Sequence, residues 1–421
     1  MTTRARSTLL PAVGVILLGA NLRPLVVAVS PLLGAIRADT GLSVSTAGLL
    51  TTLPVLCFGV LAPLAPRLGR RLGIELTLLL TMVLITAGAA VRLLQPLAAL
   101  LGGTVLIGAG IAVANVLLPG VIKRDFESRV GLMTGLYTMT MFASPALAAG
   151  LSVPLERATG LGWRRVLALW GVLAVAAIIV WLPRTRRRTR VSAADTKAAA
   201  HPVRGLWRNP LAWAVTCFMG LQAMTFYMVA AWLPTLLADA GMSGVTAGVM
   251  LSLSSVVGIV GAFLAPMLTG GAARTAAIVV AGSVLYVIAL GGLLVAPIAG
   301  AYLWMSLLGL GQGAAISLAL LFIVQRAPDI RHAAQLSSMS QCFGYVLAAV
   351  GPLALGVVHE VTGGWTIPLL LVITVLIPQT LAGVLAARGG HVSGYPDEPR
   401  AGAELLAFPS SGPRQGAGPA R

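Results

Sequence analysis

One arginine lies inside the first long apolar run of the chain. Apolar residues flank Arg23 from Leu9 to Ala20 and from Leu25 to Val29. Arg23 is about 14 residues into this run, or roughly 21 Å along a helix. A charge at membrane depth costs about 2.5–3.5 kcal/mol on insertion scales, so it is rarely kept unless it faces a wet cavity or a partner. The guanidinium is a planar fork of donors, which suits a carboxylate-like or small linear anion.

The neighbours of Arg23 shape what it can reach. Pro24 has no N–H and its ring clashes with the carbonyl of Ala20, so we expect the helix to bend beside Arg23. Asn21 lies about 200° around the helix from Arg23, and both side chains cannot face one cavity squarely. We assign Arg23 to the cavity, as the group that holds substrate charge, and Asn21 as a hydrogen-bonding residue. The alternative is a structural arginine bonded to carbonyls or amides of neighbouring helices.

The composition is that of a membrane protein. Of 421 residues, 57% are hydrophobic and only 10% are charged, whereas soluble domains carry about 25% charged residues. The net charge of +17 comes from short basic runs between apolar segments, which is the positive-inside pattern and not a nucleic-acid surface. Three cysteines, all in apolar runs, provide neither a disulfide framework nor a metal site. We expect the lipid bilayer as a partner, with no cofactor, no metal and no nucleic acid.

Runs of about 20 apolar residues, each long enough to span a bilayer, predict twelve helices. They fall near 9–31, 46–66, 74–94, 97–119, 130–153, 164–183, 210–233, 245–267, 274–295, 298–324, 335–358 and 365–387. The sequence therefore predicts an all-α polytopic membrane protein. Its two six-helix bundles comprise residues 1–183 and 210–387, joined by a basic cytoplasmic linker, 184–209. Residues 388–421 are rich in Gly, Pro, Ser and Ala and are predicted to be a disordered cytoplasmic tail.

Loop charge predicts the orientation. With the N-terminus inside, the inner segments hold most of the 29 Lys and Arg residues, and the outer loops hold only Arg37, Arg92, Arg157, Arg164 and Arg165. This bias places both termini in the cytoplasm and the chain in the inner (cytoplasmic) membrane.

The two halves are related by a repeat of about 200 residues. The matching segments are Gly41-Leu42-Ser43 with Gly241-Met242-Ser243, Thr46-Ala47-Gly48 with Thr246-Ala247-Gly248, Leu64-Ala65-Pro66 with Leu264-Ala265-Pro266, and Gly108-Ala109-Gly110 with Gly309-Leu310-Gly311. Such a parallel repeat is typical of a two-bundle transporter with its site at the midplane between the halves. We expect it to work by alternating access, as a monomer.

Further candidates lie on other helices. On the seventh helix, Gln222 and Phe226 are four residues apart and share a face, with Tyr227 at its edge. An amide and aromatic rings can line a small-ligand pocket; the alternative is interhelical packing with Gln222 as a hydrogen-bonding residue. The secondary substrate-binding candidates, each of which alone more often makes an interhelical hydrogen bond, are Asn115, Tyr137, Gln312 and Gln341.

Groups for proton coupling and for catalysis are not apparent. No Asp or Glu lies deep in a predicted helix, and Glu75 stands at a helix entrance. His359 with Glu360 is a possible relay, although a solvated pair at a helix end is the more common arrangement. No Ser/His/Asp grouping follows from spacing, so the sequence does not predict an enzyme. The Gly-x-Gly-x-Gly at 309–313 lies in an apolar run and favours close helix packing over phosphate binding.

The loop after the second helix resembles the cytoplasmic motif of the major facilitator superfamily. It reads Pro63-Leu64-Ala65-Pro66-Arg67-Leu68-Gly69-Arg70-Arg71, and the motif residues retained are Arg67, Gly69, Arg70 and Arg71. Prolines stand where the pattern has small and acidic residues, so the acidic latch that the family motif implies is missing. Arg67 can still cap helix ends of the opposite half; the alternative is a plain positive-inside loop.

Three further segments narrow the resemblance to the cyanate/nitroimidazole transporter family. They are Asn21-Leu22-Arg23-Pro24 with Ser30-Pro31-Leu32-Leu33 and Gly41-Leu42-Ser43; Asn115-Val116-Leu117-Leu118-Pro119 with Lys123-Arg124-Asp125-Phe126 and Met133-Thr134-Gly135-Leu136-Tyr137-Thr138; and Gly220-Leu221-Gln222 with Phe226-Tyr227 and Trp232-Leu233-Pro234. The resemblance implies a major facilitator fold and a secondary transporter of a small cyanate-like anion or a small polar nitroimidazole-like heteroaromatic compound. The alternatives are a drug efflux pump of the same superfamily and, in another class, a non-transporting membrane sensor or scaffold.

Overall fold

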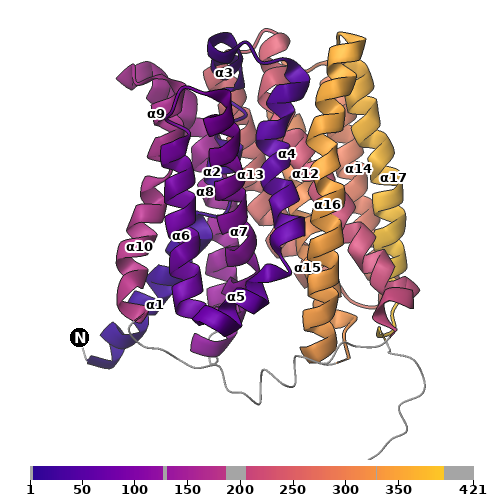
Figure 1. Ribbon diagram of the computed structural model, residues 1–421. Helices are drawn as coiled ribbons and strands as arrows, with labels where there is room; N and C mark the ends of the chain where they lie inside the picture. Colours follow the sequence, from indigo (N-terminus) through magenta and orange to yellow (C-terminus); the bar gives the residue numbers. More distant parts are fainter. Residues whose placement is uncertain (1–2, 127–129, 186–204, 329, 393–421) are drawn as a thin grey trace, which may run out of the picture.

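The computed structural model describes residues 3–126, 130–185, 205–328 and 330–392, and within these ranges the regular secondary structure is helical. Figure 1 shows long helices standing side by side, with the first half of the chain on one side and the second half on the other. The predicted all-α fold is confirmed.

The described part of the first half contains ten helices in chain order. They are α1 (Thr3–Ala20), α2 (Pro24–Val27), α3 (Leu33–Thr40), α4 (Val44–Leu61), α5 (Leu64–Leu72), α6 (Ile74–Val91), α7 (Leu97–Asp125), α8 (Val130–Thr159), α9 (Gly162–Leu169) and α10 (Val172–Thr185). The helices α3 and α9 lie at one end of the bundle and α5 at the other (Figure 1). We refer to these as the α3 end and the α5 end.

The second half begins with a short 3-10 helix, η2 (Leu206–Arg208), and continues in longer helices. They are α12 (Pro210–Asp239), α13 (Gly244–Leu268), α14 (Ala272–Val295), α15 (Ala301–Gln325), α16 (Ile330–Thr362) and α17 (Thr366–Ala387). Among the described residues, eleven helical segments are long and apolar enough to cross a membrane. The first predicted span, 9–31, differs because it is broken and supplies only a shorter apolar segment, Pro11–Val27. Together they make the twelve predicted crossings.

The repeat seen in the sequence recurs as matching contacts. Ser43 and Ser243 each cap a helix, and each hydroxyl accepts a hydrogen bond from an amide three residues on, at 3.2 Å. Trp163 donates from its indole to Asp39 at 3.2 Å, and Trp365 donates to Asp239 at 2.9 Å. Each half therefore ties the start of its last crossing to the end of its first crossing in the same way.

Glycines let the helices of each half approach closely. A Cβ at Gly108 would lie 2.7 Å from Pro54 of α4, and one at Gly309 would overlap the Ser254 carbonyl of α13. Gly110 and Gly311 likewise face α6 and α14. These contacts bear out the prediction that the Gly-x-Gly-x-Gly run at 309–313 serves helix packing.

The two halves meet along α4 with α16 and along α8 with α13. Ser30 donates its hydroxyl to the carbonyl of Ala231 at 2.6 Å. At the α3 end, the Ser45 amide in the first turn of α4 donates to Oε2 of Glu360 at 2.9 Å. His359 stacks instead on Trp365, with ring centroids 3.9 Å apart. Glu360 therefore joins the two halves, and the two side chains of the possible His359–Glu360 relay point to different partners.

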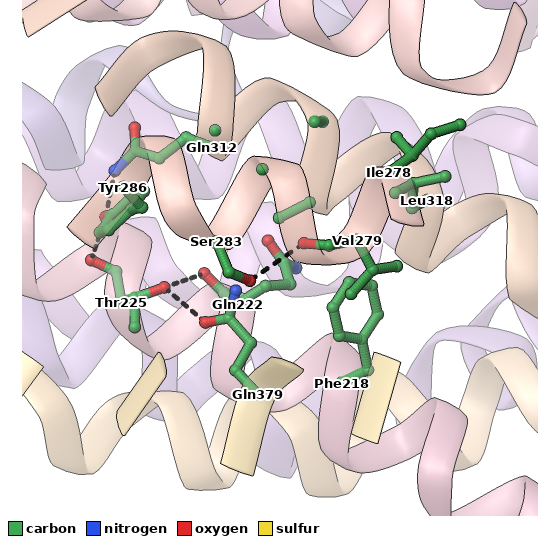
Figure 2. A pocket seen from close by; sticks show the side chains of 14 residues that line it. Phe218, Gln222, Thr225, Ile278, Val279, Ser283, Tyr286, Gln312, Leu318 and Gln379 are labelled. Carbon is green, nitrogen blue, oxygen red and sulfur yellow. Dashed lines mark hydrogen bonds between the residues drawn. The ribbon is translucent and has the colours of Figure 1, made fainter. Parts of the chain in front are cut away.

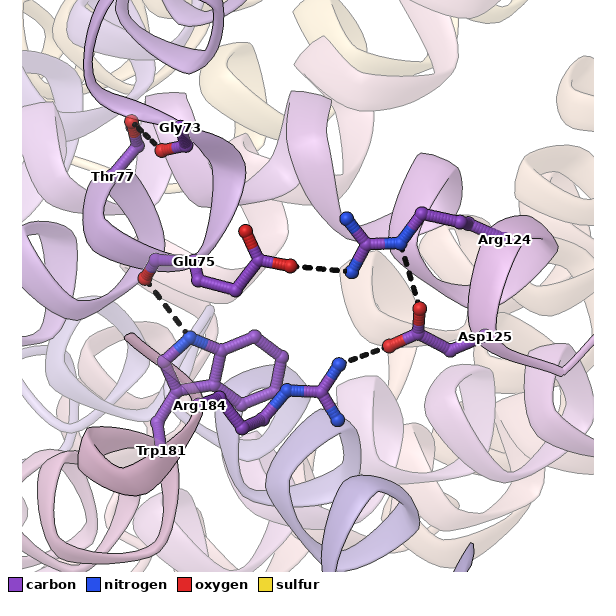
Figure 3. A network of polar contacts seen from close by, with 7 residues as sticks. All are labelled: Gly73, Glu75, Thr77, Arg124, Asp125, Trp181 and Arg184. Carbon is purple, nitrogen blue, oxygen red and sulfur yellow. Dashed lines mark hydrogen bonds and ion pairs between the residues drawn. The ribbon is translucent and has the colours of Figure 1, made fainter. Parts of the chain in front are cut away.

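A charged network ties α6, α7 and α10 together within the first half (Figure 3). Arg124 at the end of α7 pairs with Glu75 of α6 at 2.7 Å and with Asp125 at 2.7 Å. Asp125 also pairs with Arg184 of α10. Trp181 donates its indole N–H to the Glu75 carbonyl at 3.0 Å. Glu75, predicted only as a helix-entrance residue, is thus buried and paired.

The loop-motif residues lie on a helix. Residues predicted as a loop after the second span form α5, which packs against α6 and α7 of its own half. Arg67 is exposed and donates to the carbonyl of Pro63, at the start of its own helix, at 3.2 Å. Gly69 is buried against Leu117, and Arg70 and Arg71 are exposed.

The segments predicted as linker and tail are described only in part. Helix α10 extends to Thr185, inside the segment predicted as linker, and residues 186–204 lie outside the described ranges. Beyond α17, Val392 is 1% exposed and its N–H donates to the Arg326 carbonyl at 2.7 Å. The packed part of the chain therefore continues past the expected boundary at 387, while the remaining tail, 393–421, lies outside the described ranges.

Replacing Gly309 with alanine should destabilise the protein, because a Cβ there collides with the α13 backbone. Overpacking of this kind costs about 1–3 kcal/mol. We expect a lower Tm for Gly309→Ala in detergent, measured by loss of the monodisperse peak after heating. Gly291→Ala is the matched control, because nothing lies within 4 Å of a Cβ at that helical glycine. An equal Tm for both variants would contradict the packing role.

Asp125 should make stability depend on acid pH. Burial alone would raise the pKa of Asp125, but hydrogen bonds and charge from Arg124 and Arg184 outweigh burial and hold the pKa below its usual value. A lowered folded-state pKa gives stability that is present above the unfolded pKa near 4 and is lost as pH falls through the folded pKa. We expect Asp125→Asn to have a lower Tm at pH 6 and a flatter decline of Tm below pH 5 than wild type.

The control for Asp125 is Glu156→Gln, which removes a half-buried carboxylate near the opposite end of the first half. Among the described residues, Glu156 takes part in none of the ion pairs. The decline of Tm with acid should therefore match wild type in Glu156→Gln. An unchanged slope for Asp125→Asn would rule out the contribution of Asp125.

Candidate functional site

The first membrane crossing is interrupted at residues 21–23. Helix α1 ends at Ala20 and α2 begins at Pro24, with tight turns that bond Asn21 N–H to Leu18 O at 3.1 Å and Leu22 N–H to Gly19 O at 3.2 Å. Pro24 occupies the first position of α2, where its missing N–H is harmless. The predicted bend is therefore a complete break. Irregular backbone at membrane depth occurs where it is buried in protein or lines a cavity.

Arg23 is the residue that precedes α2 and is only 6% exposed. Its guanidinium carbon lies 4.7 Å from the ring centre of Phe226 on α12 and 5.9 Å from that of Phe142 on α8. One terminal nitrogen, Nη1, is buried without a hydrogen-bond partner. Among the described residues, no carboxylate forms an ion pair with Arg23. The cation thus lies between the halves, next to aromatic faces and without an acidic partner.

Three tyrosines complete the surroundings of Arg23. Tyr227 packs edge to face on Phe226, with ring centres 5.1 Å apart, and Tyr137 packs on Gly19 in the last turn of α1. Phe58 links two of them, with its ring centre 5.5 Å from that of Tyr345 and 6.3 Å from that of Tyr227. We call these rings the aromatic cluster, which comprises Phe58, Tyr137, Phe142, Phe226, Tyr227 and Tyr345. It draws on α4 and α8 from the first half and on α12 and α16 from the second.

Gly19 lets the aromatic cluster approach the break. A Cβ at Gly19 would lie 2.8 Å from the ring of Tyr137 and 2.9 Å from the hydroxyl of Thr140. The ring of Tyr137 therefore packs directly on the last turn of α1. Of the candidates predicted from the sequence, the structure brings Arg23, Tyr137, Phe226 and Tyr227 together.

Asn21 lies in the same break and is fully buried. Its Nδ2 donates to the Leu17 carbonyl at 2.7 Å. Its Oδ1 is buried without a hydrogen-bond partner. Buried polar atoms are nearly always hydrogen-bonded, so an atom left over in this way needs an explanation.

Gln222 and Gln312 occupy a different place, a small cavity inside the second half (Figure 2). Gln312 donates to the hydroxyl of Tyr286 at 2.8 Å, and Tyr286 donates to the Thr225 carbonyl at 3.3 Å. The Thr225 hydroxyl donates to Gln379 at 3.1 Å. The cavity volume is about 10 Å³, which is room for about one water molecule. Gln312 therefore bonds across helices, in keeping with the interhelical alternative, whereas Gln222 donates Nε2 to the Met219 carbonyl of its own helix at 3.0 Å. Both amides line this cavity, and neither hydrogen-bonds to Arg23 in the described part of the chain.

Among the described residues, the remaining candidates, Gln341 and Asn115, are not bonded to Arg23. Gln341 is half-buried on α16 and donates to Ser337 of its own helix at 3.0 Å. Asn115 is half-buried on α7. Neither forms a hydrogen bond with Arg23 within the part of the chain that the structure describes.

Arg92 is a positioning residue that the sequence analysis missed. Counted there as an outer-loop charge, it is in fact fully buried at the end of α6. Its Nη1 donates to the Leu25 carbonyl of α2 at 2.9 Å, and its Nε and Nη2 donate to the Thr104 hydroxyl of α7 at 3.1 and 2.9 Å. Arg92 therefore holds α2 in place beside Arg23. The sequence did contain one indication that Arg92 is buried, because Arg92 lies within the apolar run 74–94 that was predicted to span the membrane.

Comparison with known protein families gives one match along nearly the whole chain. A model described as Major Facilitator Superfamily matches residues 12–389. Among solved structures, a crystal structure of a D-xylose-proton symporter has a TM-score of 0.67 at 16% sequence identity, covering 92% of this chain and 97% of that one. At that identity the likeness concerns the fold.

Curated relatives are closer in sequence. The chain is 42% identical over 383 residues to an uncharacterized transporter, YycB, of Bacillus subtilis (strain 168), covering 90% of this chain and 94% of the relative. It is 38% identical over 386 residues to the 2-nitroimidazole transporter of Escherichia coli (strain K12), covering 90% and 95%. It is 31% identical over 351 residues to the cyanate transport protein CynX of the same organism, covering 83% and 90%.

Removing Arg92 should loosen the broken crossing. In Arg92→Met the Leu25 carbonyl loses its partner at membrane depth, a loss of about 1–3 kcal/mol. We expect amide hydrogen exchange across residues 21–32 to speed up by about one to two orders of magnitude, measured by mass spectrometry in detergent. Arg92→Lys, which keeps a donor, should be intermediate. The control is the exposed Arg165→Met, which should leave hydrogen exchange across residues 21–32 unchanged. Unchanged exchange in Arg92→Met would contradict the proposed role of Arg92 in holding α2.

Proposed function

This chain belongs to the major facilitator superfamily and is a secondary transporter, and we propose that it carries a small cyanate-like anion or a small polar nitroimidazole-like heteroaromatic compound. We further propose that it works by alternating access, as a monomer in the inner membrane with both termini in the cytoplasm. The observation that carries the substrate proposal is the buried Nη1 of Arg23, which has no partner in a site lined by both halves.

The charge balance of the site supports an anionic substrate. A buried cation loses its hydration, and the loss is offset only when a counter-charge or acceptors replace the water. Arg23 has aromatic faces beside it but no ion pair among the described residues. An anion that reaches Nη1 supplies the missing acceptor through a charge-assisted hydrogen bond.

The aromatic cluster supports a small flat substrate. Rings pack on one another in offset or edge-to-face arrangements, each worth about 0.5–1.5 kcal/mol beyond burial of area. Phe226 presents its face to Arg23 and its neighbour Tyr227 packs against it at 5.1 Å. The relatives named for 2-nitroimidazole and cyanate agree with this substrate size.

The contribution of both halves supports alternating access. Arg23 and Phe142 come from the first half and Phe226 from the second, so a ligand held among them binds both halves at once. Toward the α3 end the halves are joined by Ser30 with Ala231 and by Ser45 with Glu360. Exchanging these contacts for contacts at the α5 end would expose the site to the other side of the membrane.

Six aromatic rings around the site also favour a second candidate, an efflux pump for amphipathic drugs. The two candidates differ in their dependence on Arg23. A lipophilic cation gains nothing from a buried guanidinium, whereas an anion does. Transport of cationic dyes that persists without Arg23 would favour the efflux pump.

Arg23→Gln should abolish most anion transport. A hydrogen bond to a charged group contributes about 1.5–3 kcal/mol, so uptake of labelled cyanate or 2-nitroimidazole into proteoliposomes should fall by about ten- to a hundredfold. Arg23→Lys keeps the charge but not the planar fork and should retain part of the uptake. The exposed Arg165→Gln is the control. Full uptake by a folded Arg23→Gln protein would overturn the assignment.

A further inference from the structure

Two buried polar atoms in the broken crossing lack partners, and they differ in kind. Nη1 of Arg23 is a donor and Oδ1 of Asn21 is an acceptor. Their side chains are 6% and 0% exposed. A buried polar atom left unpaired costs about 1–3 kcal/mol. Two such atoms, with a single residue between them in the chain, indicate that a bound molecule completes the hydrogen bonding there.

The acceptor at Asn21 is fixed by its own amide group. Nδ2 donates to the Leu17 carbonyl at 2.7 Å. Turning the amide over would bring Oδ1 against that carbonyl oxygen, and two acceptors repel. Oδ1 therefore stays directed away from Leu17 and can receive an N–H or O–H from a ligand.

The break removes the geometric objection to a shared site. Two residues two apart on a regular helix point about 200° from each other. Here α1 ends at Ala20 and α2 begins at Pro24, so Asn21, Leu22 and Arg23 belong to neither helix. Their side-chain directions follow from the turns at 18–22 and not from helical periodicity.

We propose, building on the proposed function, that the substrate carries a hydrogen-bond donor as well as an anionic acceptor, the donor bound by Asn21 Oδ1 and the acceptor by Arg23 Nη1. This makes Asn21 a specificity-determining residue. Small planar acids with a ring N–H or a hydroxyl satisfy both atoms, whereas an anion without a donor leaves Asn21 Oδ1 unpaired. The aromatic cluster beside Arg23 favours a flat ring next to the guanidinium.

Matched pairs of substrates test this proposal in wild-type protein. The probes are 3- and 4-hydroxybenzoate against the corresponding methoxybenzoates, with benzoate as the reference, each labelled and taken up into proteoliposomes. One neutral hydrogen bond contributes about 0.5–1.5 kcal/mol, so at least one hydroxy acid should be preferred over its methoxy partner by about two- to tenfold. Equal uptake of all the acids, still dependent on Arg23, would show that only water occupies Asn21 Oδ1 and would overturn the inference while leaving the proposed function intact.

Variants then assign the preference to one residue. In Asn21→Leu, which keeps four side-chain heavy atoms branched at Cγ but removes the acceptor, uptake of the hydroxy and methoxy acids should become equal, while both remain sensitive to Arg23→Gln. Thr52→Val is the control, because it removes a different buried and unpaired hydroxyl. A hydroxy-acid preference that survives Asn21→Leu would overturn the role of Asn21. If Asn21→Leu does not fold, the comparison of hydroxy and methoxy acids in wild-type protein still tests whether the substrate needs a donor. If neither the benzoates nor cyanate nor 2-nitroimidazole show uptake that depends on Arg23, the proposed function itself is refuted.

Discussion

The structure depends on a break in the first membrane crossing. Pro24 cannot donate a backbone hydrogen bond, and its ring excludes a continuous helix past Ala20. Backbone groups released at membrane depth must be satisfied by the protein, because lipid offers no hydrogen bonds. Arg92 does this for Leu25 by reaching from α6 into α2. The same break leaves Arg23 and Asn21 outside regular helix, each with one unpaired buried atom. The break that Pro24 imposes on the helix thus also creates the polar centre of the site.

The repeat explains how the two halves face each other and where they differ. Ser30 bonds to Ala231, and these residues are 201 positions apart, so nearly equivalent points of the two halves touch. Both halves also tie a tryptophan to an aspartate at the α3 end. The symmetry ends at the site, because α12 runs unbroken from Pro210 to Asp239 where the first half has its break. The first half supplies a cation, whereas the second half supplies Phe226, Tyr227 and Tyr345.

Several features of the site were within reach of the sequence. Arg23 could be identified from its depth in an apolar run. The family resemblance and helical spacing identified Tyr137, Phe226 and Tyr227. Gln222 was placed on the same face as Phe226, yet its amide lies in a cavity within the second half. A buried helix contacts neighbours on all sides, so spacing along α12 gives the angle between two side chains but not which neighbour each one meets. Phe58, Phe142 and Tyr345 were missed because an aromatic residue in an apolar run has no polar neighbour in the sequence that distinguishes a site residue from a core residue.

What the sequence determined by itself is the membrane character, the twelve crossings, the repeat and the buried arginine, because apolar run length and charge position follow directly from the transfer of side chains between water and lipid. What only the tertiary structure decided is which polar groups are already paired. Arg92 was counted as a loop charge and is bonded inside the first half, while Arg23 and Asn21 keep atoms free of partners. Pairing depends on residues distant in the chain, such as Leu25 for Arg92 and Phe226 for Arg23. No local pattern of residues contains that information, since it arises only when the helices pack.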